Sequence, residues 1–473
     1  MGARARSGDV RGDLIAAVAT AQGRGALAVV RMSGPGAAAA AARVLAPWPP
    51  VPRRATRVRV HACDAPAEPL DDALATHFPA PASFTGEDVV ELSVHGGRYV
   101  AAAVLAALVE AGARPALPGE FTERAVRNGK LDLLQAEAVA DLIDARSRAM
   151  HRAALRQLSG ALSHRLGALR DALIEVEALI AYEVDFPEED DGPQPRARAA
   201  AAAARVVAEL DSLLATLPRA ELGRDGVTVV LAGAPNTGKS SLFNALAGDP
   251  RAIVSEVPGT TRDALEVLVD HSPWPLRLVD TAGLRASDDV VERLGIEVSA
   301  RRLAMAHLVL VCAERDADLQ RTCAEVAALS GAPRIAVRTK SDLRTDGRGR
   351  AAPADGEVEV LAPHTALAVV EVSAATGAGL DALRAAITDA MTAITPDPDE
   401  ELPVVTRARQ AAALRAARDE VVAFTHAWEA GELPAPVVGT HLRAAVHALD
   451  ELLGGIDVDD VLDRVFRTFC VGK

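Results

Sequence analysis

Lysine is nearly absent from this chain: arginine supplies almost all of the 51 basic residues, and only Lys130, Lys239, Lys340 and Lys473 are lysines. Arginine can replace lysine wherever a surface charge is sufficient, but a planar guanidinium does not mimic a compact ammonium group. Each retained lysine is therefore a candidate functional residue.

Cysteines and long apolar runs are also scarce. The four cysteines show no Cys-x-x-Cys spacing, which argues against a zinc site and against a disulfide framework. No apolar run approaches the ~18 residues of a spanning helix, and no signal-peptide core follows the charged segment 1–13. We therefore predict a soluble, cytoplasmic protein with no membrane segment. Its net charge of −14 provides no global attraction for nucleic acid, so any RNA contact must be local or shared with a partner.

The first part of the chain is predicted to change from mixed α/β structure to helices. Up to about residue 118, β-rich runs at 26–31 and 89–94 alternate with Gly and Pro and with an Ala-rich helix near 100–111. The stretch 118–187 contains no proline between its ends, and its apolar residues recur at helical spacing.

From residue 222 to 390, apolar strands alternate with helices, which is typical of a parallel sheet. The expected strands are 227–232, 276–279, 308–312, 335–337 and 369–372. Helical spacing returns after a Pro-rich break at 395–403. The prediction is a multidomain α/β protein with an amino-terminal α/β domain (1–125), a discontinuous helical domain (126–221 and 391–473) and an inserted, mostly parallel α/β domain (222–390).

A phosphate-binding loop opens the inserted domain. The run Gly233-Ala-Pro-Asn-Thr-Gly238-Lys239-Ser240 matches G-x-x-x-x-G-K-[ST] and lies between an expected strand and an expected helix. Backbone N–H groups of such a loop surround phosphate oxygens, Lys239 reaches the β- and γ-phosphates, and Ser240 binds Mg²⁺. The predicted contacts here are Asn236, Thr237, Gly238, Lys239, Ser240 and Ser241.

Three later motifs complete the nucleotide site, and the last two favour guanine over adenine. Asp280-Thr281-Ala282-Gly283 follows a strand, where the carboxylate supports Mg²⁺ and the glycine amide meets the γ-phosphate. In Thr339-Lys340-Ser-Asp342, the Asp carboxylate can accept from guanine N1–H and the exocyclic amine. Ser373 and Ala374 form the last base-contacting turn. Thr339 stands where Asn is commoner, which predicts a weaker affinity.

A switch segment is expected between the loop and Asp280. Its contacts are Ser255, Glu256, Val257, Pro258, Gly259, Thr260 and Thr261, with Thr261 as a second Mg²⁺ ligand. Leu284 follows Gly283, so the water-positioning Gln of Ras-like enzymes is missing. Hydrolysis then requires another source of charge and another water-orienting group.

In its whole length the chain resembles the MnmE (TrmE) family of tRNA-modification GTPases. The resemblance rests on short motifs in a fixed order, each weak alone. They are Gly23-Arg-Gly25, Val30-Arg-Met-Ser-Gly34, Ser83-Phe-Thr-Gly-Glu-Asp-Val-Val-Glu-Leu92, His95-Gly-Gly97, Pro118-Gly-Glu-Phe-Thr-Glu-Arg124, Asn128-Gly-Lys130-Leu-Asp132, Gln135-Ala-Glu-Ala-Val-Ala-Asp-Leu-Ile143, Asp185-Phe-Pro187, the nucleotide motifs and Phe469-Cys-Val-Gly-Lys473.

The resemblance implies a reaction and its partners. Family members work with an FAD-dependent partner (MnmG) on carbon five of the wobble uridine of certain tRNAs, using a one-carbon unit from 5-formyl- or methylene-tetrahydrofolate. The amino-terminal domain is implied to bind the folate and to form a homodimer. The matching folate positions are Arg31, Glu91, Lys130 and Lys473.

The resemblance also supplies the groups missing from hydrolysis. K⁺ is implied to replace an arginine finger, bound by Asn236, Ser255, Val257 and Thr260, and Glu292 is implied to orient the attacking water. Beyond the family pattern, we predict that the thiol of Cys470, beside the Lys473 ammonium, reaches the folate or the uridine.

Two other readings are weaker. A ribosome-assembly switch GTPase that binds RNA without modifying it predicts a trailing basic and aromatic module, and the region 394–473 shows neither property. Reading Cys470-Val-Gly-Lys473 as a lipidation box predicts a membrane anchor, but Gly472 and Lys473 fit prenylation motifs poorly.

Overall fold

The chain divides into two compact units in the computed structural model, each built from separate segments. The first comprises Met1–Ala140, Leu158–Val206 and Asp419–Lys473, and the second Asp141–Gln157 and Val207–Arg418. The structure describes residues 12–21, 23–63, 65, 68–145, 147–185, 196–248, 266–269, 271, 274–280, 302–343, 367–394, 405–454, 469 and 471–472.

A seven-stranded sheet forms the core of the first unit. Its strands are β1 (Ile15–Val18), β2 (Leu27–Ser33), β3 (Leu45–Ala46), β4 (Thr56–His61), β5 (Pro69–Phe78), β6 (Val89–His95) and β7 (Arg114–Pro115). They lie in the order β3-β4-β5-β6-β2-β1-β7, antiparallel except for the pair β1–β7. The expected strands near 26–31 and 89–94 are the central pair, β2 and β6.

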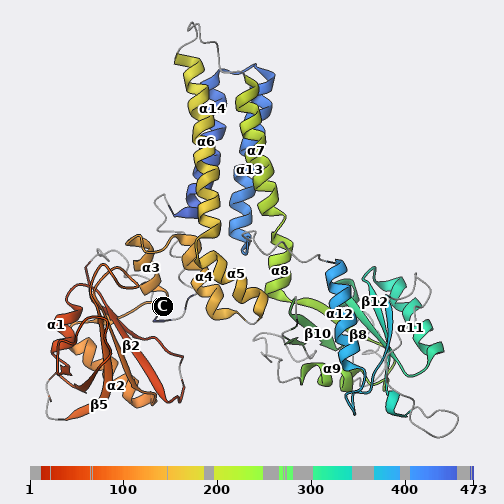
Figure 1. The fold of residues 1–473 in the computed structure, drawn as a ribbon, viewed down its shortest axis with the longest axis horizontal. Helices are drawn as coiled ribbons and strands as arrows, with labels where there is room; N and C mark the ends of the chain where they lie inside the picture. Colours follow the sequence, from red (N-terminus) through yellow and green to blue (C-terminus); the bar gives the residue numbers. More distant parts are fainter. Residues whose placement is uncertain are drawn as a thin grey trace, which may run out of the picture. The chain divides into compact units, whose positions relative to one another are not determined.

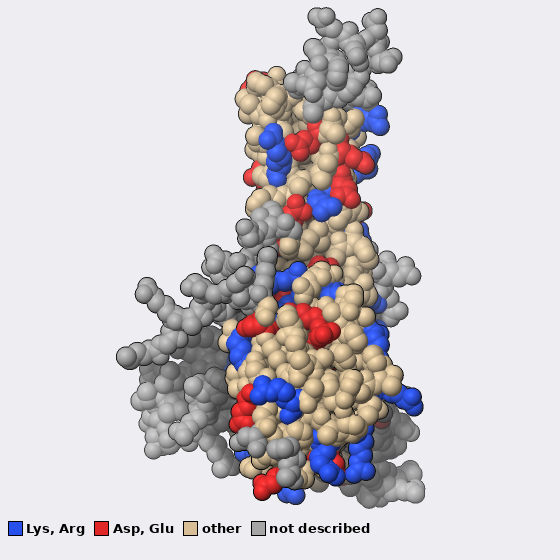
Figure 2. Space-filling model, turned by 90° about the vertical axis from the view of Figure 1, so that its left-hand side faces the viewer, with Lys and Arg blue, Asp and Glu red and all other residues tan. Residues whose placement is uncertain are grey.

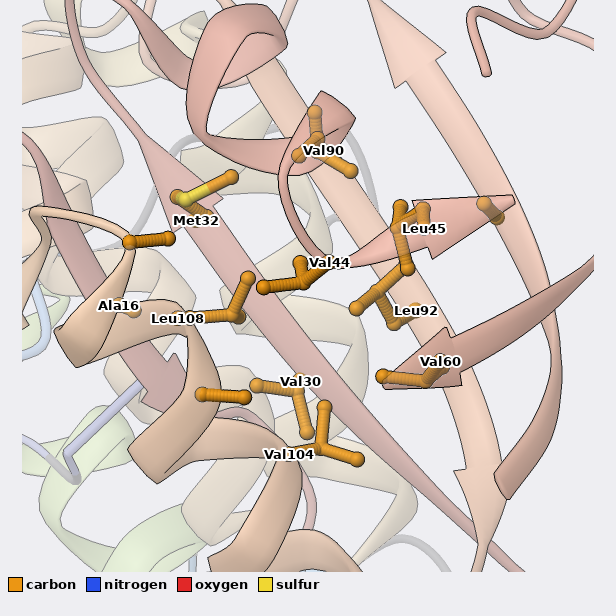
Figure 3. Close-up of a cluster of buried hydrophobic side chains, with 14 of the residues drawn as sticks. Ala16, Val30, Met32, Val44, Leu45, Val60, Val90, Leu92, Val104 and Leu108 are labelled. Atoms are coloured by element: carbon orange, nitrogen blue, oxygen red, sulfur yellow. The ribbon is translucent and has the colours of Figure 1, made fainter. Parts of the chain in front are cut away.

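Alternation of side chains gives this sheet two different faces. Val30 and Met32 of β2 and Leu92 of β6 point to the face covered by α1 (Ala37–Ala42) and α2 (Arg98–Glu110), where Val104 and Leu108 complete the apolar cluster (Figure 3). The intervening residues of β2 and β6 lie on the opposite face, because successive strand side chains alternate. That face carries Arg31 and Glu91.

Helices follow the sheet, as the 118–187 spacing predicts. They are α3 (Glu120–Arg127), α4 (Leu133–Asp144), α5 (Arg148–Leu158), α6 (Ala161–Asp185), α7 (Arg196–Leu214) and α8 (Leu217–Asp225), and towards the end of the chain α13 (Ala408–Ala430) and α14 (Ala435–Leu453). Among the described residues, no helix is both long and apolar enough to cross a membrane.

Two helices far apart in sequence pack side by side in the first unit. Helix α14 runs along α6 (Figure 1). Ion pairs join Arg170 to Asp450 at 3.4 Å and Arg443 to Glu177 at 2.9 Å. Periodicity predicts each helix but not this packing, which brings together segments on either side of the α/β insertion.

The second unit contains a six-stranded sheet. Its strands are β8 (Val227–Ala232), β9 (Glu266–Val269), β10 (Leu276–Asp280), β11 (Leu308–Ala313), β12 (Arg334–Arg338) and β13 (Ala368–Glu371), in the order β13-β12-β11-β8-β10-β9. All neighbours are parallel except the edge pair β9–β10. Each of the five predicted strands is present.

Helices cover both faces of this sheet. On one face, α9 (Lys239–Ala247) and α12 (Leu380–Ile394) pack through Leu242, Phe243 and Leu383. On the other, α11 (Asp316–Leu329) packs through Leu319 and Val326 (Figure 1). Burial on both faces explains why these strands are nearly continuous apolar runs.

Trp274, just before β10, packs beside α8 in an apolar cluster that Ala149 of α5 joins. Its side chain is only 6% exposed. A Cβ placed on Gly223 of α8 would lie 3.6 Å from the indole and 3.8 Å from the Cβ of Ala149 in α5. The buried indole N–H has no hydrogen-bond partner among the described residues. Trp274 thus links one end of β10 to α8.

Candidate functional site

The loop between β8 and α9 has the backbone that a phosphate cradle requires. Gly233 has a φ of 153° and Gly238 a φ of 87°, a region that favours glycine. A Cβ on Gly233 would lie 2.3 Å from the carbonyl oxygen of Cys312, so the close approach of loop and β11 also requires glycine. Gly238 then begins α9 as its N-cap, and the free N–H groups of the first turn face the loop.

Lys239 lies buried inside this loop. Its Nζ donates to the carbonyl oxygens of Gly233 at 2.8 Å and Ala234 at 2.7 Å. Burial lowers the pKa of Lys239, while Cys312 and Asp280 act in the opposite direction. Burial raises the pKa of Cys312 to about 12, so this residue is a protonated thiol at neutral pH and not a nucleophile.

A hydroxyl and a carboxylate meet at the start of α9. Ser240 Oγ donates to Asp280 Oδ2 at 2.9 Å, and Asp280 at the end of β10 is only 1% exposed. Oxygen donors of these two kinds suit Mg²⁺, which binds few protein ligands beside water and phosphate. The pair fits the ion that the motifs imply.

The base-contacting motif is tied to the phosphate loop. Thr339 Oγ1 donates to the carbonyl oxygen of Thr237 at 2.6 Å, and Lys340 Nζ donates to that of Asn236 at 2.9 Å. Asp342, whose carboxylate is the proposed guanine acceptor, is held by the hydroxyl of the buried Ser373 at 2.6 Å. The structure therefore brings the separate motifs into one site.

Thr339 stands where Asn is commoner, and its hydroxyl is hydrogen-bonded directly to the phosphate-binding loop. We expect Thr339→Ala to weaken GTP affinity about tenfold, because it leaves the carbonyl of Thr237 without this donor in a partly buried position. Thr339→Ser retains the hydroxyl and should bind nearly as well as the unaltered chain. Titration with a fluorescent GTP analogue measures both; equal affinities for the two variants would show that the tether does not matter.

Several predicted nucleotide and tail residues lie outside the described part of the chain. They are Ser255, Glu256, Val257, Pro258, Gly259, Thr260, Thr261, Thr281, Ala282, Gly283, Glu292, Cys470 and Lys473. Their roles stay predictions. Ser241 and Ala374 are described, in α9 and after Ser373.

Arg31 and Glu91 form a second site on the face of the amino-terminal sheet opposite α1 and α2. Arg31 Nε donates to Glu91 Oε1 at 2.8 Å. The guanidinium carbon lies 5.6 Å from the ring centroids of both Phe84 and Phe121. Sequence reasoning assigns no role to these two aromatic residues, although both lie inside the family motifs. An arginine held between rings presents a fixed cationic plane.

The side chain of Lys130 lies against the loop that contains Phe84. A Cβ on Gly86 would lie 3.3 Å from Cγ of Lys130, and Asn128 Nδ2 donates to the carbonyl oxygen of Thr85 at 2.7 Å. Lys130 itself is exposed. The loop 83–88 is thus shared by the predicted folate residues Arg31 and Lys130.

A buried polar network fixes the other side of this loop. Glu87 accepts from Ser33 Oγ at 2.8 Å and pairs with Arg124 at 3.1 Å. Arg124 also pairs with Glu120. Burial alone raises the pKa of Glu120, but hydrogen bonds from Arg114 and the N–H of Leu117, and the charges of both arginines, together lower it. Glu120 therefore stays ionised, and the network is a rigid support.

The described tail residues lie against this domain. Val471 pairs with Pro118 in an isolated antiparallel bridge, and Arg31 Nη1 donates to the carbonyl oxygen of Gly472 at 3.4 Å. Gly472 has a φ of 96°, and a Cβ there would lie 2.6 Å from the carbonyl oxygen of Val18. The tail therefore reaches the predicted folate residue Arg31.

Comparison with known proteins gives one consistent family. A model described as "MnmE helical domain" matches residues 133–470, and one described as "GTP-binding protein TrmE N-terminus" matches residues 14–130. The chain is 45% identical over 468 residues to "tRNA modification GTPase MnmE" of Azoarcus sp., covering 98% of both chains. Proteins of the same name match at 43% identity in Bradyrhizobium sp. (95% and 96% covered) and at 42% in Symbiobacterium thermophilum (98% and 99%).

Proposed function

The chain belongs to the MnmE family of tRNA modification GTPases, and from that premise we propose that it hydrolyses GTP in modifying carbon five of the wobble uridine of certain tRNAs. The observation that carries this proposal is that the loop 233–238, Asp280 and the Thr339–Asp342 motif come together in one nucleotide site. We also propose the domain division predicted from the sequence: an amino-terminal domain (1–125), a helical domain in two segments (126–221 and 391–473) and an inserted GTPase domain (222–390).

We propose that two cations serve hydrolysis. Mg²⁺ would be held by Ser240 and Thr261, with Asp280 behind Ser240. K⁺ would be held by Asn236, Ser255, Val257 and Thr260, supplying the positive charge that an arginine finger provides elsewhere. Lys239 would contact the phosphates, and Glu292 would orient the attacking water.

We propose that a tetrahydrofolate derivative binds the face of the amino-terminal sheet that carries Arg31 and Glu91. Arg31, Glu91, Lys130 and Lys473 would contact it, as the resemblance implies. The support from the structure is that Arg31, Glu91 and the loop beside Lys130 lie together, with Gly472 bonded to Arg31. Cations suit the carboxylates of a folate tail.

This site makes a direct prediction. Lys130→Ala should weaken the binding of 5-formyl-tetrahydrofolate about tenfold, because it removes a charge-assisted hydrogen bond. Arg127→Ala, at an exposed arginine nearby that pairs with Glu123, is the matched control and should leave affinity unchanged. Isothermal titration gives the constants. Unchanged affinity in both Lys130→Ala and Arg31→Ala would remove the folate assignment.

We further propose a cytoplasmic homodimer that acts with an FAD-dependent partner of the MnmG kind. A deletion strain tests the whole function. Nucleoside analysis of its bulk tRNA should lack the carboxymethylaminomethyl-type wobble group, and the intact chain should restore it and co-purify with the FAD protein. Fully modified tRNA in the deletion strain would refute the proposal.

A further inference from the structure

Two turns at one end of the amino-terminal sheet are tied into a single surface. The N–H of Gly25 donates to the carbonyl oxygen of Gly96 at 3.0 Å, and the N–H of Gly96 donates to that of Ala26 at 3.1 Å. A Cβ on Gly96 would lie 2.4 Å from the Gly25 carbonyl oxygen, so no other residue fits. Arg24 and His95 directly precede the two glycines that are joined in this way.

The exposed side chain of His95 is held by the carboxylate of Asp71, which is itself largely covered. Its side chain is 71% exposed, whereas that of Asp71 is only 9% exposed. Asp71 accepts from His95 Nδ1 at 2.6 Å and from the His95 backbone N–H at 2.8 Å. Since a carboxylate accepts, Nδ1 carries the hydrogen, and Nε2 is the ring atom left for a ligand.

Exposed cations and an aromatic ring lie close to His95 in the chain, on the two turns and at the start of α2. Arg98 and Tyr99 open α2, and Tyr99 is 80% exposed in a chain with two tyrosines and only 3% aromatic residues. Leu27, the cross-strand partner of His95, is 66% exposed. Arg24 and Arg98 are exposed and make no ion pair or side-chain hydrogen bond with the rest of the described chain.

We propose that this two-turn surface (Arg24, Leu27, His95, Arg98 and Tyr99) binds a single-stranded stretch of the tRNA substrate. The proposal rests on the proposed function and specifies where the RNA is held. Exposed aromatic rings stack on unpaired bases, guanidinium groups contact phosphates, and a fixed imidazole nitrogen can bond a phosphate or a 2′-hydroxyl. An acidic protein partner would explain the arginines but not the exposed ring beside them.

The charge pattern favours a local site of this kind. The chain has a net charge of −14, and Figure 2 shows acidic and basic side chains interspersed over the face that it draws. An RNA ligand therefore needs a small set of unpaired cations combined with stacking, because no broad cationic field attracts it. The two-turn surface supplies both.

The position of the two-turn surface on the sheet also suits a tRNA substrate. His95 and Glu91 lie on the same face of β6, and Leu27 and Arg31 on the same face of β2, because each pair is four residues apart. The separation along the strands is about 13 Å. A nucleotide held by His95 therefore lies on the face that carries the proposed folate site.

Binding of transcribed tRNA with an unmodified wobble uridine tests the proposal. With the full chain and fluorescein-labelled tRNA, Tyr99→Ala should weaken binding about tenfold, and Tyr99→Phe should retain it, because stacking needs only the ring. Arg98→Ala should weaken binding and lower the slope of log K against log salt by about 0.7. Arg57→Ala, at a 78% exposed arginine paired with Asp72, is the control and should change neither quantity.

Other outcomes would overturn the proposal. They are unchanged binding in Tyr99→Ala and Arg98→Ala, an equal loss in Arg57→Ala, no binding of tRNA by the unaltered chain, or a change of oligomeric state in light scattering that accounts for the loss. GTP hydrolysis and folate titration on the same samples separate this result from the proposed function. Both should remain normal in every variant, and their failure in the unaltered chain would refute the proposed function instead.

Discussion

Exchanging Na⁺ for K⁺ at constant ionic strength is expected to raise the rate of GTP hydrolysis by between about tenfold and ~10³-fold, the lower end of what an arginine finger contributes. The reason is the residue set of the nucleotide site. Leu284 stands where Ras-like enzymes carry Gln. A bound K⁺ would supply positive charge at the phosphates during transfer. Steady-state phosphate release in the two salts measures the effect, and equal rates would remove K⁺ from the reaction.

Asn236 provides the sharper form of this experiment. Asn236→Ala should abolish the difference between K⁺ and Na⁺ while leaving nucleotide affinity nearly intact. The contact between this residue and Lys340 runs through the backbone carbonyl, which alanine keeps. Asn236 has a φ of 60°, which alanine tolerates poorly, so Asn236→Gly is the companion variant. A K⁺ response that survives in both variants would exclude the Asn236 amide as a ligand.

Cys470→Ser is expected to abolish tRNA modification and to leave K⁺-stimulated GTP hydrolysis within about twofold of normal. A serine hydroxyl matches the thiol in size but is a far weaker nucleophile near neutral pH. The two described residues that follow this cysteine contact the amino-terminal domain: Val471 pairs with Pro118, and Gly472 accepts from Arg31. Nucleoside analysis of tRNA from a complemented deletion strain supplies the measurement.

Two controls separate chemistry from structure at the tail. Cys323→Ser changes a cysteine buried in α11 of the second unit, so it tests for a general effect of losing a thiol. Cys470→Ala removes the thiol without adding a polar group. If tRNA remained fully modified with Cys470→Ser, Cys470 would have only a packing role. If GTP hydrolysis were lost together with tRNA modification, the variant would have a folding defect.

The parallel sheet is the part of the fold that sequence predicts best. All six residues of β11 are buried, so the strand is an uninterrupted apolar run. Asp280 ends β10, and Thr339 directly follows β12, so strand ends locate the motifs. The edge strand β9 and the two-residue strands β3 and β7 have no comparable signal, since each is short and depends on its neighbour.

Contacts across long sequence separations are the part that sequence does not predict. The resemblance assigns both Arg31 and Glu91 to the folate, but their ion pair depends on the register of β2 against β6. Thr339 reads as a departure that weakens binding, while its hydroxyl holds the carbonyl of Thr237. A buried hydroxyl needs a partner, but only the folded backbone determines which carbonyl lies within reach.

The placement of Trp274 gives the chain an intrinsic optical reporter. This indole lies just before β10, whose far end is Asp280, and it packs beside Gly223 of α8 in an apolar cluster that Ala149 of α5 joins. Indole emission responds to the polarity around the ring, so a shift of β10 against these helices when nucleotide is exchanged should change its wavelength. The chain has three tryptophans, and replacing Trp48 and Trp428 by phenylalanine leaves Trp274 as the sole emitter. Stopped-flow fluorescence could then follow the nucleotide cycle in real time without an attached dye.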